Sequence, residues 1–139
     1  MSSFSRHPVK LIHPFTGKLV EHETGEHRFQ AMKATSEKDY DLILNADGPT
    51  EAKDLGRSID LRAGWGSEYG SLCWYVMCET VIAKAQQHPN LLKQLLATGD
   101  RALWEDSPVD DIWGIRHHSN YRGKNLLGRS WMYARMVSS

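Results

Sequence analysis

The chain is poor in several features that would assign a function at once. It has two cysteines among 139 residues, no excess of either charge, since 17 basic residues balance 17 acidic ones, and no apolar run of membrane-spanning length. Without a net charge, no long-range field recruits nucleic acid or an anionic membrane, so an anionic ligand must meet local positive charge. The start, Met1-Ser2-Ser3, lacks the basic and apolar regions of a signal peptide. We therefore expect a soluble, cytoplasmic protein with no membrane partner.

The cysteines, glycines and histidines exclude further classes of site. Cys73 and Cys78 are too close together in an expected helix for a disulfide and wrongly spaced for a CxxC metal site, so we expect reduced, buried thiols. Gly64-Trp65-Gly66 lacks the spacing and the strand-to-helix context of a phosphate-binding glycine loop. The seven histidines are not arranged as a ligand set, so we expect neither a metal nor another cofactor.

What is present suffices for one packed domain, because 40% of the residues are hydrophobic and 24% are charged. We expect a single domain over residues 1–139, of α+β class, mostly helical with a small β-sheet. Val9 to Ile12 and Lys18 to Glu21 flank a Pro- and Gly-containing turn, which predicts a β-hairpin. Helices are expected at about residues 25–34, 36–46, 50–57, 68–87 and 91–97 and from about 125 onward, with short strands at 102–105 and 112–115.

A carboxylate, an amide and an amine fall on one stripe of the first expected helix. At about 100° per residue, Glu26, Gln30 and Lys33 project from nearly the same face, while Phe29 points toward the core. Burying an acid beside a lysine is costly unless both are needed. The alternative is a solvated face with an ordinary helix ion pair.

A second polar cluster spans residues 105–114, where four carboxylates, Glu105 and Asp110 among them, surround a Ser-Pro turn and lead into Trp113-Gly114. In a cleft, one carboxylate would bind ribose hydroxyls or activate water, and Trp113 would stack on a flat ring with Gly114 allowing close approach. The alternative is a solvated loop that precedes a buried tryptophan.

A third cluster precedes the last expected helix. Arg122 and Lys124 lie just before a helix N-terminus, where free backbone N–H groups and the helix dipole favour an anion such as phosphate. The alternative is an ordinary loop with Asn125 as the helix cap.

Short matches to one family run through most of the chain in a consistent order. They are Phe4-Ser5 with His7-Pro8-Val9; Glu26-His27 with Phe29-Gln30-Ala31 and Lys33-Ala34; Ala52 with Leu55-Gly56-Arg57; Arg62 with Trp65; Met77 with Lys84; Asn90-Leu91 with Leu95-Leu96-Ala97-Thr98-Gly99; Glu105 with Ser107-Pro108 and Asp110; Trp113-Gly114; and Gly123 with Asn125 and Leu127-Gly128. In this order and spacing the chain resembles the NADAR family, also called the YbiA-like family of N-glycosidases.

The resemblance implies a compact α+β fold and cleavage of N-glycosidic bonds at ribose C1. It implies two substrate classes: phosphoribosylamino intermediates of riboflavin biosynthesis, and ADP-ribose attached to guanine bases in nucleic acid. It also implies a Schiff-base lysine, which matches Lys33, with Glu26 as the catalytic carboxylate and Asp110 in proton transfer or sugar binding. The remaining expected substrate-binding residues are Gln30, Phe29, Glu105, Trp113, Gly114 and Asn125 around the pocket and Arg57, Arg122 and Lys124 for phosphate.

The chain departs from the family pattern at a few positions. An N-terminal Asn that would line the pocket is missing, and Arg28 and Arg116 stand where an aromatic and a small residue are usual. Any nucleic-acid affinity is therefore expected from a local patch including Arg28, Arg116 or Arg122. Two alternatives to an N-glycosidase remain: a pocket that binds ADP-ribose or a nucleotide without turnover, and a structural interaction protein.

Overall fold

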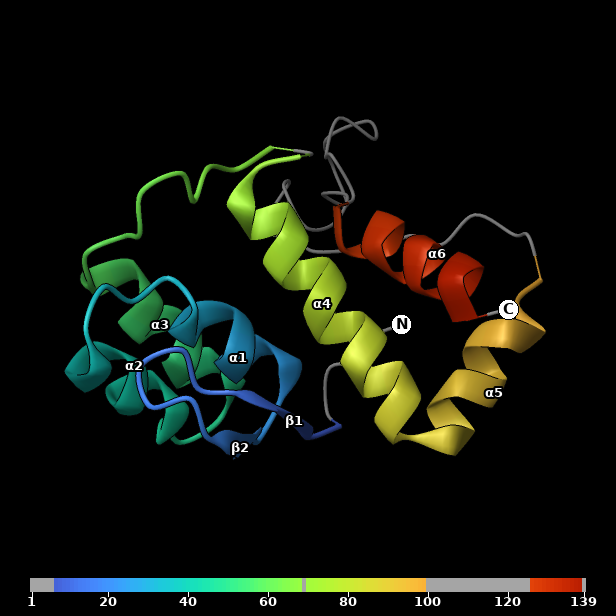
Figure 1. The fold of residues 1–139 in the computed structure, drawn as a ribbon, viewed down its shortest axis with the longest axis horizontal. Coiled ribbons are helices and arrows are strands. Elements are labelled where there is room, and N and C mark those ends of the chain that lie inside the picture. The colour runs from blue at the N-terminus through green and yellow to red at the C-terminus, as the bar shows by residue number, and fades with distance from the viewer. Residues whose placement is uncertain (1–6, 69, 100–125, 139) are drawn as a thin grey trace.

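The computed structural model describes residues 7–68, 70–99 and 126–138. Within these ranges the chain forms a two-stranded sheet and six helices (Figure 1), which confirms the mostly helical α+β class. The elements are β1 (Val9–Ile12), β2 (Leu19–His22), α1 (Gly25–Ala31), α2 (Glu37–Leu44), α3 (Pro49–Ser58), α4 (Leu72–Gln87), α5 (Pro89–Ala97) and α6 (Leu126–Ser138). The strands expected at 102–105 and 112–115 lie outside the described residues.

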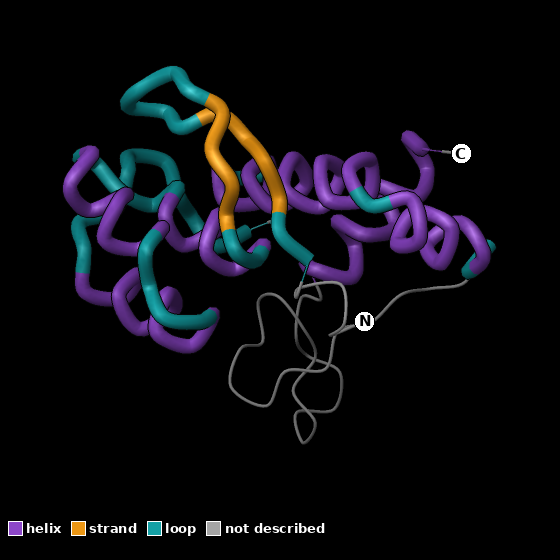
Figure 2. Tube along the Cα trace, turned by 90° about the horizontal axis from the view of Figure 1, so that it is seen from below, coloured by secondary structure: helices purple, strands orange, loops and turns teal. Residues whose placement is uncertain are grey.

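The expected hairpin is confirmed. β1 and β2 pair antiparallel with Val9 opposite His22 and Ile12 opposite Leu19, and the two strands run side by side in Figure 2. The connecting turn closes with hydrogen bonds from His13 N–H to Lys18 O and from Gly17 N–H to His13 O, both at 2.8 Å. Gly17 has φ +73°, a conformation that glycine adopts without strain. The proline and glycine of this turn therefore mark the place where the chain reverses.

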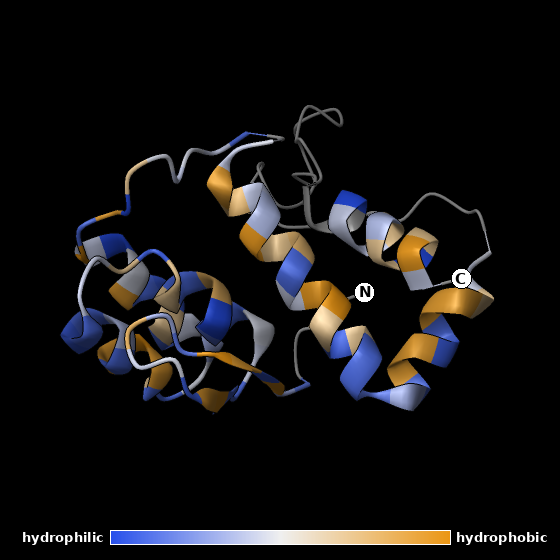
Figure 3. Cartoon of the chain, in the orientation of Figure 1, coloured by the Kyte–Doolittle hydropathy of each residue, from blue (hydrophilic) through white to orange (hydrophobic). Residues whose placement is uncertain are grey.

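The central element is α4, which runs diagonally between α1–α3 on one side and α5 and α6 on the other (Figure 1). Hydrophobic and hydrophilic residues alternate along it and along α5 (Figure 3), as expected for helices that bury one face. The core gathers side chains from α1 to α6, with Phe29, Tyr40, Ile43, Leu91, Leu95 and Trp131 among the largest fully buried ones.

Capping residues and glycines next to the helices in the sequence determine where several helices begin or end. Ser36 caps α2 by accepting a hydrogen bond from Asp39 N–H at 3.2 Å, as the sequence predicts. Gly99, with φ +61°, ends α5 and donates to Leu96 O at 3.1 Å. The start expected for α4 was wrong: the helix begins at Leu72 rather than near residue 68, because Gly70 has φ +87°, which interrupts a right-handed helix.

The first helix is shorter than expected, which separates Lys33 from it. α1 ends at Ala31, and the next bonds, from Lys33 N–H to Gln30 O and from Ala34 N–H to Ala31 O, span only three residues. Lys33 O instead accepts from Arg62 N–H at 2.9 Å, so the tertiary contact replaces the next helical bond. The expectation that all three polar side chains share one helix is therefore wrong for Lys33.

A buried histidine joins the hairpin to α2. His22 Nδ1 donates to Val9 O at 3.2 Å, and Tyr40 O–H donates to His22 Nε2 at 2.6 Å. Burial lowers the pKa of His22 from 6.5 to about 4 and raises the pKa of Tyr40 to about 12. Both groups are therefore neutral in the folded protein at neutral pH.

Acid is expected to destabilise the fold through His22. The unfolded chain binds a proton at this histidine below about pH 6.5 and the folded chain does so only near pH 4, so stability falls as pH drops across that window. The expected loss is about 3 kcal/mol in the free energy of unfolding, measured by urea titration at several pH values. His22→Gln, which can still donate to Val9 O, should flatten this dependence. An equally steep pH dependence in the variant would contradict the assignment.

Among the described residues, no helix has both the length and the hydrophobicity needed to cross a bilayer.

Candidate functional site

Glu26 and Gln30 form a hydrogen-bonded pair on α1. Gln30 Nε2 donates to Glu26 Oε1 at 2.9 Å across one helical turn, as their spacing predicts. The Glu26 carboxylate is partly exposed, while the Gln30 side chain is buried. A buried amide therefore orients a partly exposed carboxylate. We call these two residues the Glu26–Gln30 pair.

The Glu26–Gln30 pair depends on a glycine in α3. A Cβ added at Gly56 would lie 2.0 Å from Gln30 Oε1 and 3.0 Å from Gln30 Cδ, so only glycine leaves room for this amide. Glycine inside a helix costs about 1 kcal/mol relative to alanine, and here the missing side chain makes room for Gln30. Within the described part of the chain Gln30 Oε1 has no hydrogen-bond partner. The amide is therefore held by packing against α3 as well as by its hydrogen bond to Glu26.

Lys33 and Phe29 lie at the other end of α1. The Lys33 Nζ atom is 5.8 Å from the centre of the Phe29 ring, a cation–π arrangement, and the side chain is half-buried. Phe29 itself is 1% exposed and packs against Trp65 with 5.1 Å between ring centres. Phe29, expected to bind substrate, thus lies in the core beneath Lys33.

A second lysine, Lys84 of α4, reaches the start of α1. Its side chain is 1% exposed, and a Cβ added at Gly25 would lie 3.1 Å from Lys84 Nζ and 3.3 Å from Lys84 Cδ. The amine is therefore packed over the backbone of the residue that precedes Glu26. The contact is looser than the one at Gly56, and a side chain at position 25 would push the end of Lys84 away by a few tenths of an ångström.

Burial changes the chemistry of this amine. Removal from water lowers the pKa of Lys84 from 10.5 to about 7, and the nearby Glu26 carboxylate opposes that change. A substantial fraction of Lys84 is then neutral at physiological pH. A neutral amine has a free electron pair, so it can act as a nucleophile or as a base.

The sequence reasoning gave Lys84 no role, although a signal was present. Val76, Thr80 and Lys84 follow one another at four-residue intervals in the most apolar helix, and all three are buried. A lysine on such a stripe must be buried unless the helix turns that face to solvent. Buried lysines are rare and costly, so its position in the stripe is a sign of function.

Arg28 ties α1 to α4 and does not form part of a surface patch. Its side chain is 3% exposed and donates to Thr80 Oγ1 at 2.9 Å and to Val76 O at 3.3 Å, and it forms an ion pair with Glu79. These interactions pair the guanidinium group of Arg28 with partners inside the protein. The expectation that Arg28 contributes to a nucleic-acid patch is therefore wrong.

The buried histidines beside α1 have structural partners. His27 Nε2 donates to Ala46 O at 3.0 Å, and its Nδ1 accepts from the Thr24 hydroxyl at 2.8 Å. Thr24 also caps α1 by accepting from His27 N–H at 3.2 Å. In the described ranges no group of three His, Cys, Asp or Glu side chains is placed to hold a metal ion.

Of the expected phosphate partners, the structure describes one. Arg57 is exposed on α3 and lies 3.4 Å from Asp54 Oδ1, a weak surface ion pair that a ligand can displace. The other expected site residues lie outside the described residues and stay predictions: Glu105, Asp110, Trp113, Gly114, Arg122, Lys124 and Asn125. The expected patch residue Arg116 lies outside them as well.

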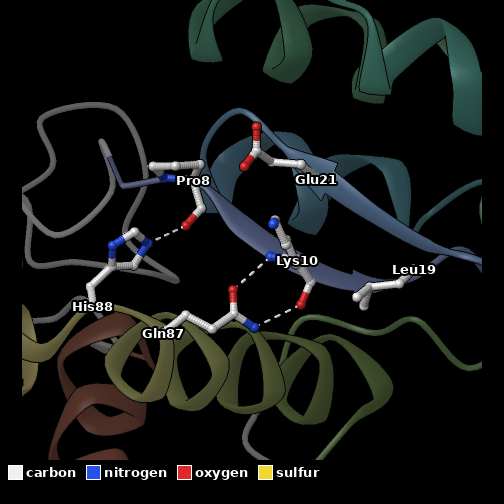
Figure 4. A pocket seen from close by; sticks show the side chains of 6 residues that line it. All are labelled: Pro8, Lys10, Leu19, Glu21, Gln87 and His88. Atoms are coloured by element: carbon white, nitrogen blue, oxygen red, sulfur yellow. Dashed lines mark hydrogen bonds between the residues drawn. The ribbon is translucent and has the colours of Figure 1, made fainter.

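A groove of about 530 Å³ lies where the hairpin meets the end of α4 (Figure 4). The Gln87 amide bonds both to Lys10 N–H and to Lys10 O at 2.8 Å, which docks β1 on α4. The lining residues are Pro8, Lys10, Leu19, Glu21, Gln87 and His88. Of the expected site residues that the structure describes, none lines this groove.

Comparison with known proteins identifies similar sequences over nearly the whole chain. The model of the NADAR domain matches residues 1–137. An N-glycosidase of Nostoc punctiforme is 34% identical over 96% of this chain and 81% of that protein, and the N-glycosidase YbiA of Escherichia coli is 36% identical over 91% and 73%. A riboflavin biosynthesis protein of Vibrio vulnificus is 32% identical over 81% of this chain, which spans 29% of that longer protein.

The fold is similar as well. The NMR structure of E. coli YbiA matches 98% of this chain and 75% of that chain at 36% identity, with a TM-score of 0.79. The expected YbiA-like fold is confirmed.

Proposed function

This chain belongs to the NADAR domain family, and we propose that it is an N-glycosidase, a hydrolase that cleaves the N-glycosyl bond between ribose C1 and a base or amine. The observation that carries the proposal is the Glu26–Gln30 pair, in which a buried amide holds a partly exposed carboxylate. A polar group held in place before substrate binds is what catalysis requires, because it need not reorganise during the reaction.

The reaction needs a group that stabilises positive charge developing at C1, and a proton for the departing nitrogen. We assign the first task to Glu26, whose negative charge opposes that developing positive charge. Asp110 is proposed for proton transfer or for binding the sugar hydroxyls. Arg57, Arg122 and Lys124 are proposed to bind phosphate, with Trp113 stacking on the flat ring of the ligand.

Two substrate classes fit this proposal: a phosphoribosylamino intermediate of riboflavin biosynthesis and ADP-ribose attached to guanine in nucleic acid. The name of the Vibrio relative supports the first class. Mass spectrometry of reactions with a phosphoribosylamino-pyrimidine and with DNA carrying ADP-ribosylated guanine separates them, because each releases a different base and sugar. Binding of ADP-ribose without hydrolysis of either substrate would instead identify a binding module.

Glu26→Gln is expected to lower kcat at least about 100-fold, because it keeps the size of the side chain and removes the negative charge that the transition state needs. The fold should be retained, with the free energy of unfolding changed by less than about 1 kcal/mol. Steady-state kinetics and urea unfolding measure both effects.

The matched control is Glu37→Gln, the same change at an exposed glutamate in the first turn of α2, which should leave kcat unchanged. A Glu26→Gln enzyme with the wild-type rate would remove Glu26 from the mechanism.

A further inference from the structure

The first turn of α1 approaches α4 through a glycine. A Cβ added at Gly25 would lie 3.1 Å from Lys84 Nζ and 3.6 Å from Thr80 Cγ2, so the bare backbone of α1 faces these two side chains of α4. A glycine has no side chain that could fix the distance between two helices. The spacing of α1 and α4 must therefore be set by another residue.

The side chain that spans the two helices is Arg28, one turn after Gly25. Its Nη1 donates to Thr80 Oγ1 at 2.9 Å and to Val76 O at 3.3 Å, and its Nη2 pairs with Glu79. The Thr80 hydroxyl donates to Val76 O at 2.7 Å, so its oxygen is already oriented when it accepts from Arg28. Because the guanidinium group is rigid and planar, these contacts fix how α1 lies against α4.

Stability does not explain a buried arginine at this position. The attraction between a buried charge and its partners is offset by the loss of hydration, so such a group contributes little net stability. Arg28 is 3% exposed, and within the described ranges its Nε has no hydrogen-bond partner, which adds a further cost. An aromatic residue, usual here in the family pattern, carries no charge to bury. Arg28 is better explained by the geometry that it imposes.

We propose that Arg28 is a positioning residue, which through Thr80 holds the start of α1 against α4 and so keeps the Glu26 carboxylate beside the Lys84 amine. This inference rests on the proposed N-glycosidase function. Thr80 lies one turn before Lys84 on α4, and the field of Glu26 acts on the Lys84 amine. Precise placement is decisive for a catalytic group, since a displacement of about 1 Å can cost about 100-fold in rate.

Arg28→Met tests this role, because methionine is of similar length and leaves Thr80 bonded to Val76 O. We expect kcat to fall at least about tenfold and KM to change by less than about twofold, since the carboxylate is displaced while binding contacts remain. The urea midpoint of unfolding should not fall, because an apolar side chain replaces a buried charge. The field of Arg28 also acts on Tyr40 and His22, so a structural role would appear as lost stability.

Two substitutions at Thr80 separate the hydrogen bond from packing. Thr80→Val removes the oxygen that accepts from Arg28 and should lower kcat about as much as Arg28→Met, whereas Thr80→Ser keeps the hydroxyl and should retain kcat within about twofold. The matched control is Arg135→Met, because Arg135 Nη1 of α6 donates to Thr98 Oγ1 at the end of α5 at 2.7 Å. This change removes the same kind of bond away from α1 and should leave kcat unchanged.

The titration of the Lys84 amine gives a readout that needs no substrate. It is followed by NMR of isotope-labelled lysine side chains, with Lys84→Met to assign the signal. Glu26→Gln should lower the pH midpoint of this amine, because the lost carboxylate charge no longer favours the protonated form. In an Arg28→Met background the same substitution should lower the midpoint by less than about half as much, because the carboxylate has moved away.

The outcomes separate this inference from the proposed function. An unchanged kcat in Arg28→Met and Thr80→Val, a loss of kcat that follows lost urea stability in every variant, or an equal effect of Glu26→Gln in both backgrounds would overturn the positioning role. Hydrolysis of an N-glycosyl substrate by the wild-type protein would still leave the proposed function standing. Absence of that hydrolysis together with a reduced effect of Glu26→Gln in the Arg28→Met background would overturn the proposed function and keep the positioning role.

Discussion

Replacing Lys84 with methionine is expected to stabilise the protein and to lower its activity. Methionine has nearly the same length and no charge, so it fills the space over Gly25 without the cost of burying an amine. With a pKa near 7 in the folded protein and 10.5 in the unfolded chain, that cost amounts to several kcal/mol at pH 7. The free energy of unfolding should therefore rise by about 2–4 kcal/mol, while kcat falls at least about tenfold because the amine beside Glu26 is lost.

The stability gained by Lys84→Met should decrease as the pH rises. Between about pH 7 and pH 10.5 the unfolded lysine binds a proton that the folded one has lost, so raising the pH stabilises the wild-type protein. The advantage of Lys84→Met should shrink across the same window. Urea titrations at about pH 7 and about pH 9.5 measure it. A variant less stable than the wild type at both pH values would show that Lys84 contributes to the fold through its amine.

Replacing Gly56 with alanine is expected to disrupt the Glu26–Gln30 pair. Alanine inside a helix normally stabilises by about 1 kcal/mol over glycine, but here its Cβ would lie 2.0 Å from Gln30 Oε1. Gln30 must then move, and its hydrogen bond to Glu26 is lost. We expect the free energy of unfolding to fall by about 1–3 kcal/mol and kcat to fall at least about tenfold.

A double-mutant cycle separates this clash from a general effect on α3. In a Gln30→Ala background the obstructing oxygen is absent, so Gly56→Ala should become neutral or stabilising, as it is in an ordinary helix. Urea unfolding of the four proteins gives the coupling free energy. An equal destabilisation in both backgrounds would show that the contact with Gln30 is not the reason for the glycine.

Several features of the fold were predicted because their causes are local. The Pro-Gly turn specifies the hairpin, Ser36 caps α2, and Gly99 ends α5. The Glu26–Gln30 pair is local as well, since side chains four residues apart meet on any helix. The end of α1 was not predictable in this way, because Lys33 O bonds to Arg62, a residue of a distant loop.

The sequence by itself determined the order and type of the elements that the structure describes, the family and one carboxylate–amide pair, because each depends on short-range spacing or on matches along the chain. Only the tertiary structure decided which polar side chains are buried and which of them contact residues far away in the sequence. Arg28 lies inside the protein against Thr80 and Glu79, and Lys84 reaches Gly25, because α4 packs across α1. Burial and the field of a neighbouring charge control the reactivity of an amine, and both depend on residues far away in the sequence.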